Sequence, residues 1–473
     1  MNQHPRWACL ALLLLACLLR FWDLGGQSLW YDEAYTWWVA TQVTMEESIT
    51  SSIHEVIPPG SYLLWRGWVA LTGETEFALR SVSALLGVLT VAAAGRVAWW
   101  LTQRHAGAVA ALALFTIAPP MLWASREVRM YGPVLCFSLL ADAALLETLF
   151  GPARTRARWA WGWGISALLS LYMLVLAGFW LIGQGVFALI VLLKSALSVQ
   201  SADQKKRLEI PSSLRALLFP AVAATVLYLP WLLAASRSLG VNRGYWAGYL
   251  PPQAFLRTTF QGITVFDFIA DEAWAFVISG LILLLAALSL LLTRRKPLAG
   301  LYPLCYALPA LALLVPLYRT LPKWGLRHST IFAPAPYLAL AVAWGTVGGL
   351  PSRRRRLATL ALGMSSVLVS GYLLIASANL LEAARLSPVF AHEDWRGVAQ
   401  YVTENRAPED LIIIETGSVF PTWVYYAGRD RILPLPDDAL LDVTHVLNYE
   451  NTAPLLNESL QSATGVWLVN WLA

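Results

Sequence analysis

Apolar runs of similar length recur along most of the chain, and they limit its fold more than any other feature. A helix needs about 20 mostly apolar residues to cross a hydrocarbon layer about 30 Å thick, and the sequence holds eleven such runs with few charges. Only 13% of the 473 residues are charged, 58% are hydrophobic, and the mean hydropathy is +0.56, which is unlike a soluble globular domain. The runs lie at 7–22, 77–101, 106–123, 131–150, 159–175, 176–193, 214–236, 273–293, 298–317, 328–350 and 357–379. The sequence therefore predicts a polytopic α-helical membrane protein with about eleven transmembrane helices.

Two of these runs need comment. The fifth and sixth share one apolar stretch, 159–193, that is too long for a single helix, and we place their boundary near residue 175. The first run resembles a secretory signal, but Arg20 and the sequence FWDLGG follow it where a small-residue cleavage site would stand. We therefore expect an uncleaved membrane anchor.

Short basic runs between the apolar segments indicate the orientation of the helices. With the N-terminus in the cytoplasm, all of these runs fall on the cytoplasmic side, as the positive-inside rule requires. They are RTRAR at 154–158, KKR at 205–207, RRK at 294–296 and RRRR at 353–356. The loops then expected outside are 23–76, 124–130, 236–272 and 318–327. We predict a multi-pass protein of the plasma or inner membrane with an extracytoplasmic C-terminal domain. The pI near 9.0 reflects this orientation and not a nucleic-acid partner.

The last part of the chain, 381–473, reads as a small soluble α/β domain after a membrane domain at 1–380. LIIIE at 411–415 has the pattern of a buried strand, and a helix is expected around VFPTWVYYAG at 419–428. Further strands are expected at THVLNY and VWLVNW. The chain ends directly after a strand, so we expect this domain to be truncated before a closing helix.

A further helix is expected from EDWRGVAQYV at the start of this domain. Asp394 stands at an N-cap position, and Trp395 follows as an apolar packing residue. We predict that this helix docks the domain onto the membrane part.

Two adjacent carboxylates follow the first apolar run, in SLWYDEAYTWW at 28–38. These are Asp32 and Glu33, and a third acid, Glu55, precedes the Pro58–Pro59 pair. Neighbouring carboxylates repel one another, so the pKa of one tends to rise, which suits a general base. One isolated acid near the membrane surface would be explained more simply as a solvated charge beside a span, without a role in chemistry. The adjacency and the aromatic flanks favour a catalytic role.

Cations stand in two loops that are expected outside. Arg126 and Arg129 lie in SREVRMYGP, and Lys323 and Arg327 lie in YRTLPKWGLRH. Their position runs against the positive-inside rule and indicates an anion, and arginine binds phosphate by paired hydrogen bonds. The alternative is ion pairing with Glu127 or with the acids of the first loop. A base beside cations fits a reaction in which a hydroxyl acceptor is activated and a lipid-linked phosphate leaves.

Four segments, LWYDEAYT, EVIPPGSYLL, SREVRMYGP and EDWRGVAQYV, occur in this order. Together they resemble the GT-C membrane glycosyltransferases of the protein O-mannosyltransferase and aminoarabinose transferase superfamily, especially its bacterial branch. The resemblance covers nearly the whole chain. It implies transfer of a sugar from a polyprenyl-phosphate-linked donor to a hydroxyl or similar acceptor at the outer membrane face, usually with inversion.

The resemblance also implies roles for individual residues. Asp32 matches the general base and Glu33 its acidic neighbour, while Glu55 matches the acid that precedes the Pro-Pro pair. Arg126, Glu127 and Arg129 match the family's ARMYG-like segment before a span. Arg327 falls where the family often keeps a basic residue.

The sequence departs from the family at two places. Many relatives have histidine immediately before the Pro-Pro pair, where Ile57 stands here, and histidine within the fifth and sixth span region, where this chain reads SLYMLVLAG. These departures leave metal binding and acceptor identity open. Asp32 and Glu33 could ligate a divalent cation weakly, but we predict no required metal or other cofactor. The expected partners are the lipid-linked donor, a glycan, lipid or protein acceptor, and the bilayer.

Two other classes of function were weighed. A transporter or flippase of lipid-linked sugars would keep ionisable residues near the bilayer midplane and show inverted repeats, whereas the charges seen here lie at the ends of spans and no repeat is visible. A noncatalytic scaffold would use the C-terminal domain to bind a partner. His105 and His392 lack metal-ligand spacing, so surface or capping roles are predicted for both.

Overall fold

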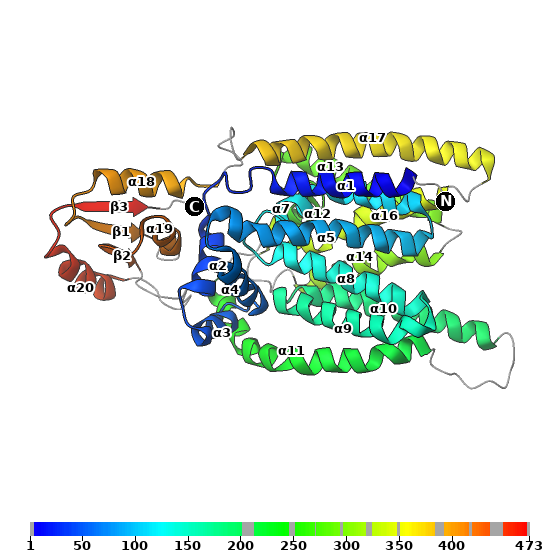
Figure 1. Cartoon of the computed structure of the whole chain (residues 1–473), viewed down its shortest axis with the longest axis horizontal. Helices are drawn as coiled ribbons and strands as arrows, with labels where there is room; N and C mark the ends of the chain where they lie inside the picture. Colours follow the sequence, from blue (N-terminus) through cyan, green and yellow to red (C-terminus); the bar gives the residue numbers. More distant parts are fainter. Residues whose placement is uncertain are drawn as a thin grey trace.

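The computed structural model describes most of the chain. The described residues are 4–200, 212–245, 251–269, 271–293, 297–317, 324–347, 351–383, 392–415, 419–435 and 448–470. Within them, long helices form a bundle, and a small sheet with its own helices lies beyond one end of that bundle (Figure 1).

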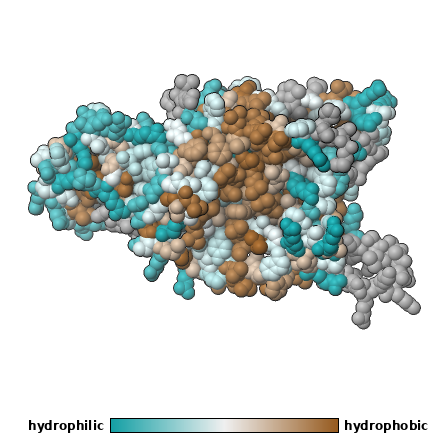
Figure 2. Space-filling model, viewed as in Figure 1, coloured by the Kyte–Doolittle hydropathy of each residue, from teal (hydrophilic) through white to brown (hydrophobic). Residues whose placement is uncertain are grey.

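Every apolar run predicted to cross the membrane coincides with helix in this bundle. The helices are α1 (His4–Phe21), α5 (Glu76–Thr102), α6 (His105–Ile117) with α7 (Pro119–Ala124), α8 (Tyr131–Phe150), α9 (Arg156–Met173), α10 (Ala177–Gln200), α11 (Ser212–Tyr245), α13 (Glu272–Ser289), α14 (Pro297–Leu317), α16 (Pro334–Val347) and α17 (Ser352–Ala383). Among the described residues, six helical segments are long and apolar enough to span a membrane. A hydrophobic band crosses the visible face of the bundle (Figure 2). The polytopic helical fold is confirmed, and the total of eleven crossings stays a prediction.

Short elements connect these helices. They are η1 (Ala153–Thr155), α12 (Pro252–Ile263), η2 (Leu290–Thr293), α15 (Leu326–Ser329) and η3 (Thr330–Phe332). Two breaks have local causes. Leu174 is extended, with φ −154° and ψ 128°, and separates α9 from α10 close to the predicted boundary. Ala118 is also extended because it precedes Pro119, which disfavours helical backbone in the residue before it.

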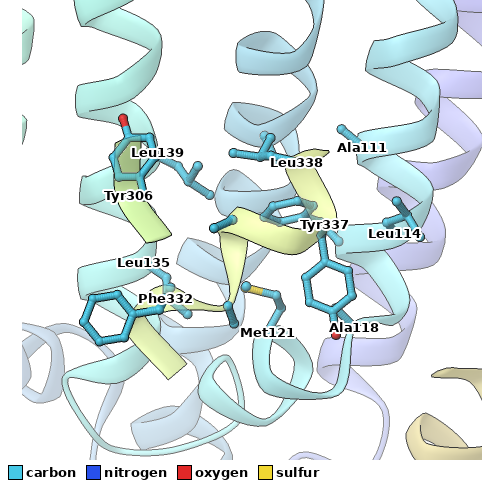
Figure 3. Close-up of a cluster of buried hydrophobic side chains, with 14 of the residues drawn as sticks. Ala111, Leu114, Ala118, Met121, Leu135, Leu139, Tyr306, Phe332, Tyr337 and Leu338 are labelled. Atoms are coloured by element: carbon cyan, nitrogen blue, oxygen red, sulfur yellow. The ribbon is translucent and has the colours of Figure 1, made fainter. Parts of the chain in front are cut away.

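The core of the bundle is packed from several helices at once. α8 lies against α5 and α9, and α16 lies against α6. Figure 3 shows Leu135 and Leu139 of α8 in one buried cluster with Leu114 of α6 and Leu338 of α16. Such interdigitation fixes the relative positions of the helix ends that carry the polar residues described below.

The first loop folds into three helices at one end of the bundle, which we call the loop end. They are α2 (Tyr31–Thr41), α3 (Met45–His54) and α4 (Gly60–Thr72). Thr44 caps α3 in a capping box with Glu47, and Nε1 of Trp65 on α4 donates to the carbonyl of Leu79 on α5 at 2.9 Å. The N-terminus lies at the opposite end of the bundle (Figure 1).

The C-terminal part is the small α/β unit that the sequence predicts. It contains α18 (Trp395–Asn405), β1 (Leu411–Glu415), α19 (Phe420–Ala427), β2 (Ile432–Leu435), α20 (Tyr449–Leu460) and β3 (Val466–Asn470). The sheet is parallel with the order β2-β1-β3, and Ile412 aligns with Ile432 and with Trp467. Most of the predicted strand at 444–449 lies outside the described residues, and its last residue, Tyr449, begins α20 instead.

This unit packs on the first loop through aromatic contacts. The rings of Trp38 on α2 and Phe420 on α19 meet edge to face at 4.8 Å, and those of Trp37 and Tyr425 at 5.0 Å. Trp395 is buried in the same cluster, and its predecessor Asp394 caps α18 by accepting from the amide of Gly397. The predicted N-cap and packing residue are thus where the sequence indicates. α2 lies between the bundle and the C-terminal unit.

Candidate functional site

The carboxylate of Asp32 lies at the loop end, in the first turn of α2. Trp30 is extended, with φ −89° and ψ 169°, and the helix begins at the next residue. One carboxylate oxygen accepts a hydrogen bond from Arg327, and the other lies 3.9 Å from Nη2 of Arg129. The Asp32 side chain is only 13% exposed, so these two guanidinium groups balance its charge at a partly dehydrated position.

Arg129 reaches α2 from the turn between α7 and α8. Its Nη1 donates to the carbonyl of Asp32 at 3.2 Å and to Oγ1 of Thr36 at 3.0 Å. The turn is tight, because a Cβ added at Gly132 would lie 2.5 Å from the carbonyl oxygen of Ala124, so glycine is required there. The Nε atom of Arg129 is buried without a hydrogen-bond partner. One donor of this guanidinium is therefore unused.

Arg327 comes from α15, far along the chain. The segment is anchored by Trp324, whose Nε1 donates to Oγ1 of Thr259 on α12 at 2.9 Å. The Arg327 guanidinium stands 5.7 Å from the centroid of the Trp30 ring, within the range of a cation–π contact. Lys323, predicted to act with Arg327, lies outside the described residues. Asp32, an acid of the first loop, is thus in contact with Arg327, a cation of the fourth loop.

Glu55 follows α3, and hydroxyl groups enclose its carboxylate. Oε1 accepts from Tyr35 at 2.6 Å and also from Ser51, and Oε2 accepts from Tyr62 at 3.3 Å. Burial raises the pKa of Glu55, although the hydroxyls and the charge of Arg129 favour its ionised form. Glu55 is therefore linked to α2 through Tyr35 and to Arg129 through charge, one step removed from Asp32.

Glu33 has a different environment from its neighbour Asp32. Its side chain is fully buried, and it accepts from Nε and Nη2 of Arg80 at 2.9 and 2.5 Å and from the amide of Val128 at 2.8 Å. Successive residues of a helix point about 100° apart, so the two adjacent acids serve different faces of α2. The contacts of Glu33 hold α2 on α5, which is a structural role, and its catalytic role stays a prediction.

Arg126 is also separated from the Asp32 cluster. Its Nη1 donates to the carbonyls of Leu19, Arg20 and Trp22, at 3.2, 3.2 and 2.7 Å. These are carbonyls at the C-terminal end of α1 and just beyond it, which a cation satisfies well. In this structure Arg126 thus caps α1, and its phosphate-binding role stays a prediction.

Three further residues lie in this region. Glu127, which the sequence offers as an ion-pair partner, accepts from Nε1 of Trp30 at 2.7 Å, and its Oε1 lies 3.6 Å from Nε2 of His392. His392, for which a surface or capping role is predicted, stands beside this buried carboxylate. Arg80 carried a usable signal, since a cation inside an apolar span needs a partner. The sequence offers no such signal for His392, because His392 and Glu127 are far apart in the chain and no spacing links them.

The predicted absence of a required metal is not tested by these contacts. Within the described ranges, no group of three or more histidine, cysteine, aspartate or glutamate side chains is arranged to hold a metal ion.

Comparison with known proteins rests on structure alone. No family model matches the chain, and no curated protein matches it. The structure is similar to ArnT from Cupriavidus metallidurans in the apo state, with 13% identity, a TM-score of 0.58, and coverage of 98% of this chain and 90% of that one. ArnT bound to undecaprenyl phosphate gives 14% identity and a TM-score of 0.53, over 97% and 89% of the two chains.

Two larger proteins match over part of their length. The apo oligosaccharyltransferase of Archaeoglobus fulgidus gives 13% identity and a TM-score of 0.54, with 92% of this chain and 65% of that chain covered. The Pmt1-Pmt2 O-mannosyltransferase complex of S. cerevisiae, bound to the sugar donor, gives 18% identity and a TM-score of 0.41, with 50% of this chain and 34% of that chain covered. The chain has the GT-C fold of membrane glycosyltransferases. At these levels of identity the likeness establishes the fold, as the four sequence segments predicted.

Proposed function

We propose that this protein is a membrane glycosyltransferase that moves a sugar from a polyprenyl-phosphate-linked donor to a hydroxyl acceptor. The observation that carries the proposal is the partly buried contact of Asp32 with Arg327 and Arg129 at the loop end. The GT-C fold supports it, as does the similar ArnT structure that was solved with undecaprenyl phosphate. A carboxylate and two guanidinium groups at one point match an attacking hydroxyl and a departing phosphate.

The chemistry requires an exchange of ionic partners. Without donor, Asp32 is the counter-ion of Arg327. A donor phosphate would take over Arg327 and the unused Nε donor of Arg129, because arginine pairs well with phosphate oxygens. Asp32 is then released to accept the hydroxyl proton. The acceptor oxygen bonds to the anomeric carbon while the bond from that carbon to the phosphate oxygen breaks, with inversion, and polyprenyl phosphate leaves.

The remaining predicted residues support this arrangement indirectly. Glu55 bonds Tyr35 of α2 and favours the charged form of the neighbouring Arg129, so its proposed role is to position the base and the cation. Lys323 stays a proposed phosphate ligand. The donor sugar is a hexose or a pentose in this proposal, and the acceptor is a glycan, lipid or protein that carries a hydroxyl group.

The location of the reaction follows from the orientation proposed for the helices. Cytoplasmic basic runs would put the N-terminus inside, and the first loop and the C-terminal unit lie together at the other end of the bundle (Figure 1). We therefore propose transfer at the extracytoplasmic face of the plasma or inner membrane. We also propose that no metal is required; activity lost in chelator and restored by one divalent ion would contradict this.

One observation favours transport as a second candidate function. Asp142 on α8 is fully buried within the bundle, where ionisable residues commonly mark transport paths. It accepts hydrogen bonds from Trp180 at 3.1 Å, Gln184 at 2.7 Å and Tyr306 at 2.6 Å. Asp142 lies in the middle of its helix, so the prediction that charges lie at the ends of spans was wrong for this residue. These enclosing donors make Asp142 a link between α8, α10 and α14. Movement of a lipid-linked sugar across vesicles without phosphate release would favour transport.

The decisive experiment measures free polyprenyl phosphate by mass spectrometry. Purified protein is mixed with a panel of polyprenyl-phosphate sugars and envelope extract, with wild type beside Asp32→Asn. Asp430→Asn serves as the matched control, because Asp430 is exposed on the C-terminal unit, where it pairs with Arg406. Release by wild type and by the control, but not by Asp32→Asn, is expected. Equal release by all three would remove Asp32 from the reaction.

A further inference from the structure

The imidazole of His392 lies between two buried carboxylates at the loop end. Its Nε2 is 3.6 Å from Oε1 of Glu127, and its Nδ1 is 3.9 Å from Oε2 of Glu33. The ring stands 5.6 Å from the ring of Trp30, centroid to centroid. The His392 side chain is only 22% exposed, so water screens a charge on this ring only in part.

The charges around the ring favour a protonated imidazole. Glu127 faces it from the turn before α8, Glu33 from α2, and Arg80 from α5; Arg126 lies near both carboxylates. Arg80 is already engaged with Glu33. With a neutral ring, the Glu127 carboxylate, which is 4% exposed, would depend on its bond from Trp30 and on the charges of Arg80 and Arg126. A protonated ring adds a cation 3.6 Å from this carboxylate, which matters because an under-compensated buried charge is costly.

The direction of both pKa shifts agrees with a charged pair. Burial alone would lower the pKa of His392, but the nearby carboxylate of Glu127, with the charge of Glu33, raises it overall. Burial alone would raise the pKa of Glu127, but the nearby imidazole of His392 and the charge of Arg80 lower it overall. Each group therefore stabilises the ionised form of the other.

A continuous set of contacts joins this pair to the proposed reaction site. Glu127 accepts from Nε1 of Trp30 at 2.7 Å, and Trp30 is the residue immediately before α2. The Trp30 ring also lies 5.7 Å from the guanidinium of Arg327, which in turn donates to Asp32. Trp30 therefore contacts His392 and Glu127 as well as the cation that pairs with the proposed base.

We propose that protonated His392 is a positioning residue, which holds Trp30 through Glu127 and so keeps Arg327 and Asp32 in their reactive arrangement. This inference rests on the proposed function. It also assigns a task to the C-terminal unit, because His392 stands two residues before the N-cap of α18, and the carbonyl of Glu393 accepts from Oγ of Ser28 at 2.7 Å. Docking of the C-terminal unit would therefore affect the geometry of the site through this short segment.

The sign of the pH effect follows from the pair. The charged ring supports the arrangement below the raised pKa of His392 and ceases to do so as the pH rises through it. The kcat for lipid-phosphate release is therefore expected to fall on the alkaline side in wild type. His392→Gln, which keeps a donor but carries no charge, should show the low alkaline kcat at every pH.

Two variants and one control separate positioning from folding. At pH values on the acid side of the alkaline decline, the kcat of His392→Gln should be about tenfold or more lower than that of wild type, because small misplacements of reacting groups are costly, while the KM for donor changes little. His392→Lys keeps a cation that does not titrate there, so it should restore much of kcat and lose the alkaline decline. His105→Gln, at the exposed start of α6, should behave as wild type. A His392→Gln profile parallel to that of wild type would overturn the proposal.

A measurement independent of turnover distinguishes this proposal from the proposed function. The chain has six histidines, so ¹³C-histidine NMR in detergent can assign His392 by its loss in His392→Gln. Its pKa should lie above the ordinary value near 6.5 and should fall in Glu127→Gln. An ordinary pKa that is unchanged in Glu127→Gln would refute the proposal even if transfer occurs. A raised, Glu127-dependent pKa without any transfer would instead count against the proposed glycosyltransferase activity.

Discussion

The guanidinium of Arg327 donates to the carboxylate of Asp32 across 295 residues of sequence. The contact joins the first turn of α2 to α15, and Arg129 completes it from the turn before α8. Three separate segments therefore converge on one carboxylate at the loop end.

Replacement of Asp32 by Asn removes the proposed base and keeps its size. Loss of a general base typically costs 10²- to 10⁴-fold in rate, so phosphate release should fall by about that factor. Binding of the donor should persist, because Arg327 and Arg129 remain and their competing anion is gone. Release rates and donor affinity, measured on protein with an unchanged thermal unfolding midpoint, check both parts; unaltered turnover would exclude the role.

Arg129 and Arg126 form a matched pair for the phosphate role. Arg129→Gln, like Arg327→Gln, should raise the KM for donor about tenfold or more, the cost expected for a lost hydrogen bond to a charged group. Arg126→Gln should lower the thermal unfolding midpoint instead, since its donors hold carbonyls at the end of α1. Donor titrations and thermal melts of the variants provide the comparison. Equal loss of donor affinity in both would place Arg126 at the site after all.

Glu33→Gln tests whether the second acid is structural. The change leaves the buried guanidinium of Arg80 without its ionic partner, and breaking such a pair costs about 3 kcal/mol or more. The expected result is a lower unfolding midpoint in detergent, with residual activity proportional to the folded fraction. A stable protein that had lost all turnover would restore the catalytic assignment of Glu33.

Glu55 should make stability depend on pH. Because burial raises its pKa above the ordinary 4.5, the folded protein binds this proton more tightly than the unfolded chain. Stability should therefore decline as the pH rises from about 4.5 through the raised pKa. Glu55→Gln should remove that part of the decline in thermal melts taken across this range. Glu46→Gln, an exposed acid of α3, serves as control, and identical slopes in all three proteins would refute the assignment.

Much of the fold could be predicted from the sequence because length and apolarity are local properties. Each apolar run became a helix, and even the break near Leu174 fell where length demanded one. β2 was missed because it is only four residues long and contains Pro434, which is tolerated there on the edge of the sheet. These features depend on residues that are close together in the sequence.

The site was predicted less completely, since its contacts join distant segments. Spacing identified Asp32 and the cations, but it treated Asp32 and Glu33 as one unit. Only the helical geometry of α2 separates them, turning one to Arg327 and the other to Arg80. Arg126 and Arg129 were likewise paired by proximity, although the turn between α7 and α8 sends them to different partners.

The position of α2 between the bundle and the C-terminal unit has a consequence for mutational tolerance. Its residues from Glu33 to Ala40 are all buried, so the helix lacks the solvent-facing stripe on which surface helices accept almost any polar side chain. A saturation library of this helix should accordingly accept few replacements on any face. A larger side chain on the side of α2 that faces α19 would displace Asp32. Changes selected in the C-terminal unit and in α2 should therefore come in compensating pairs.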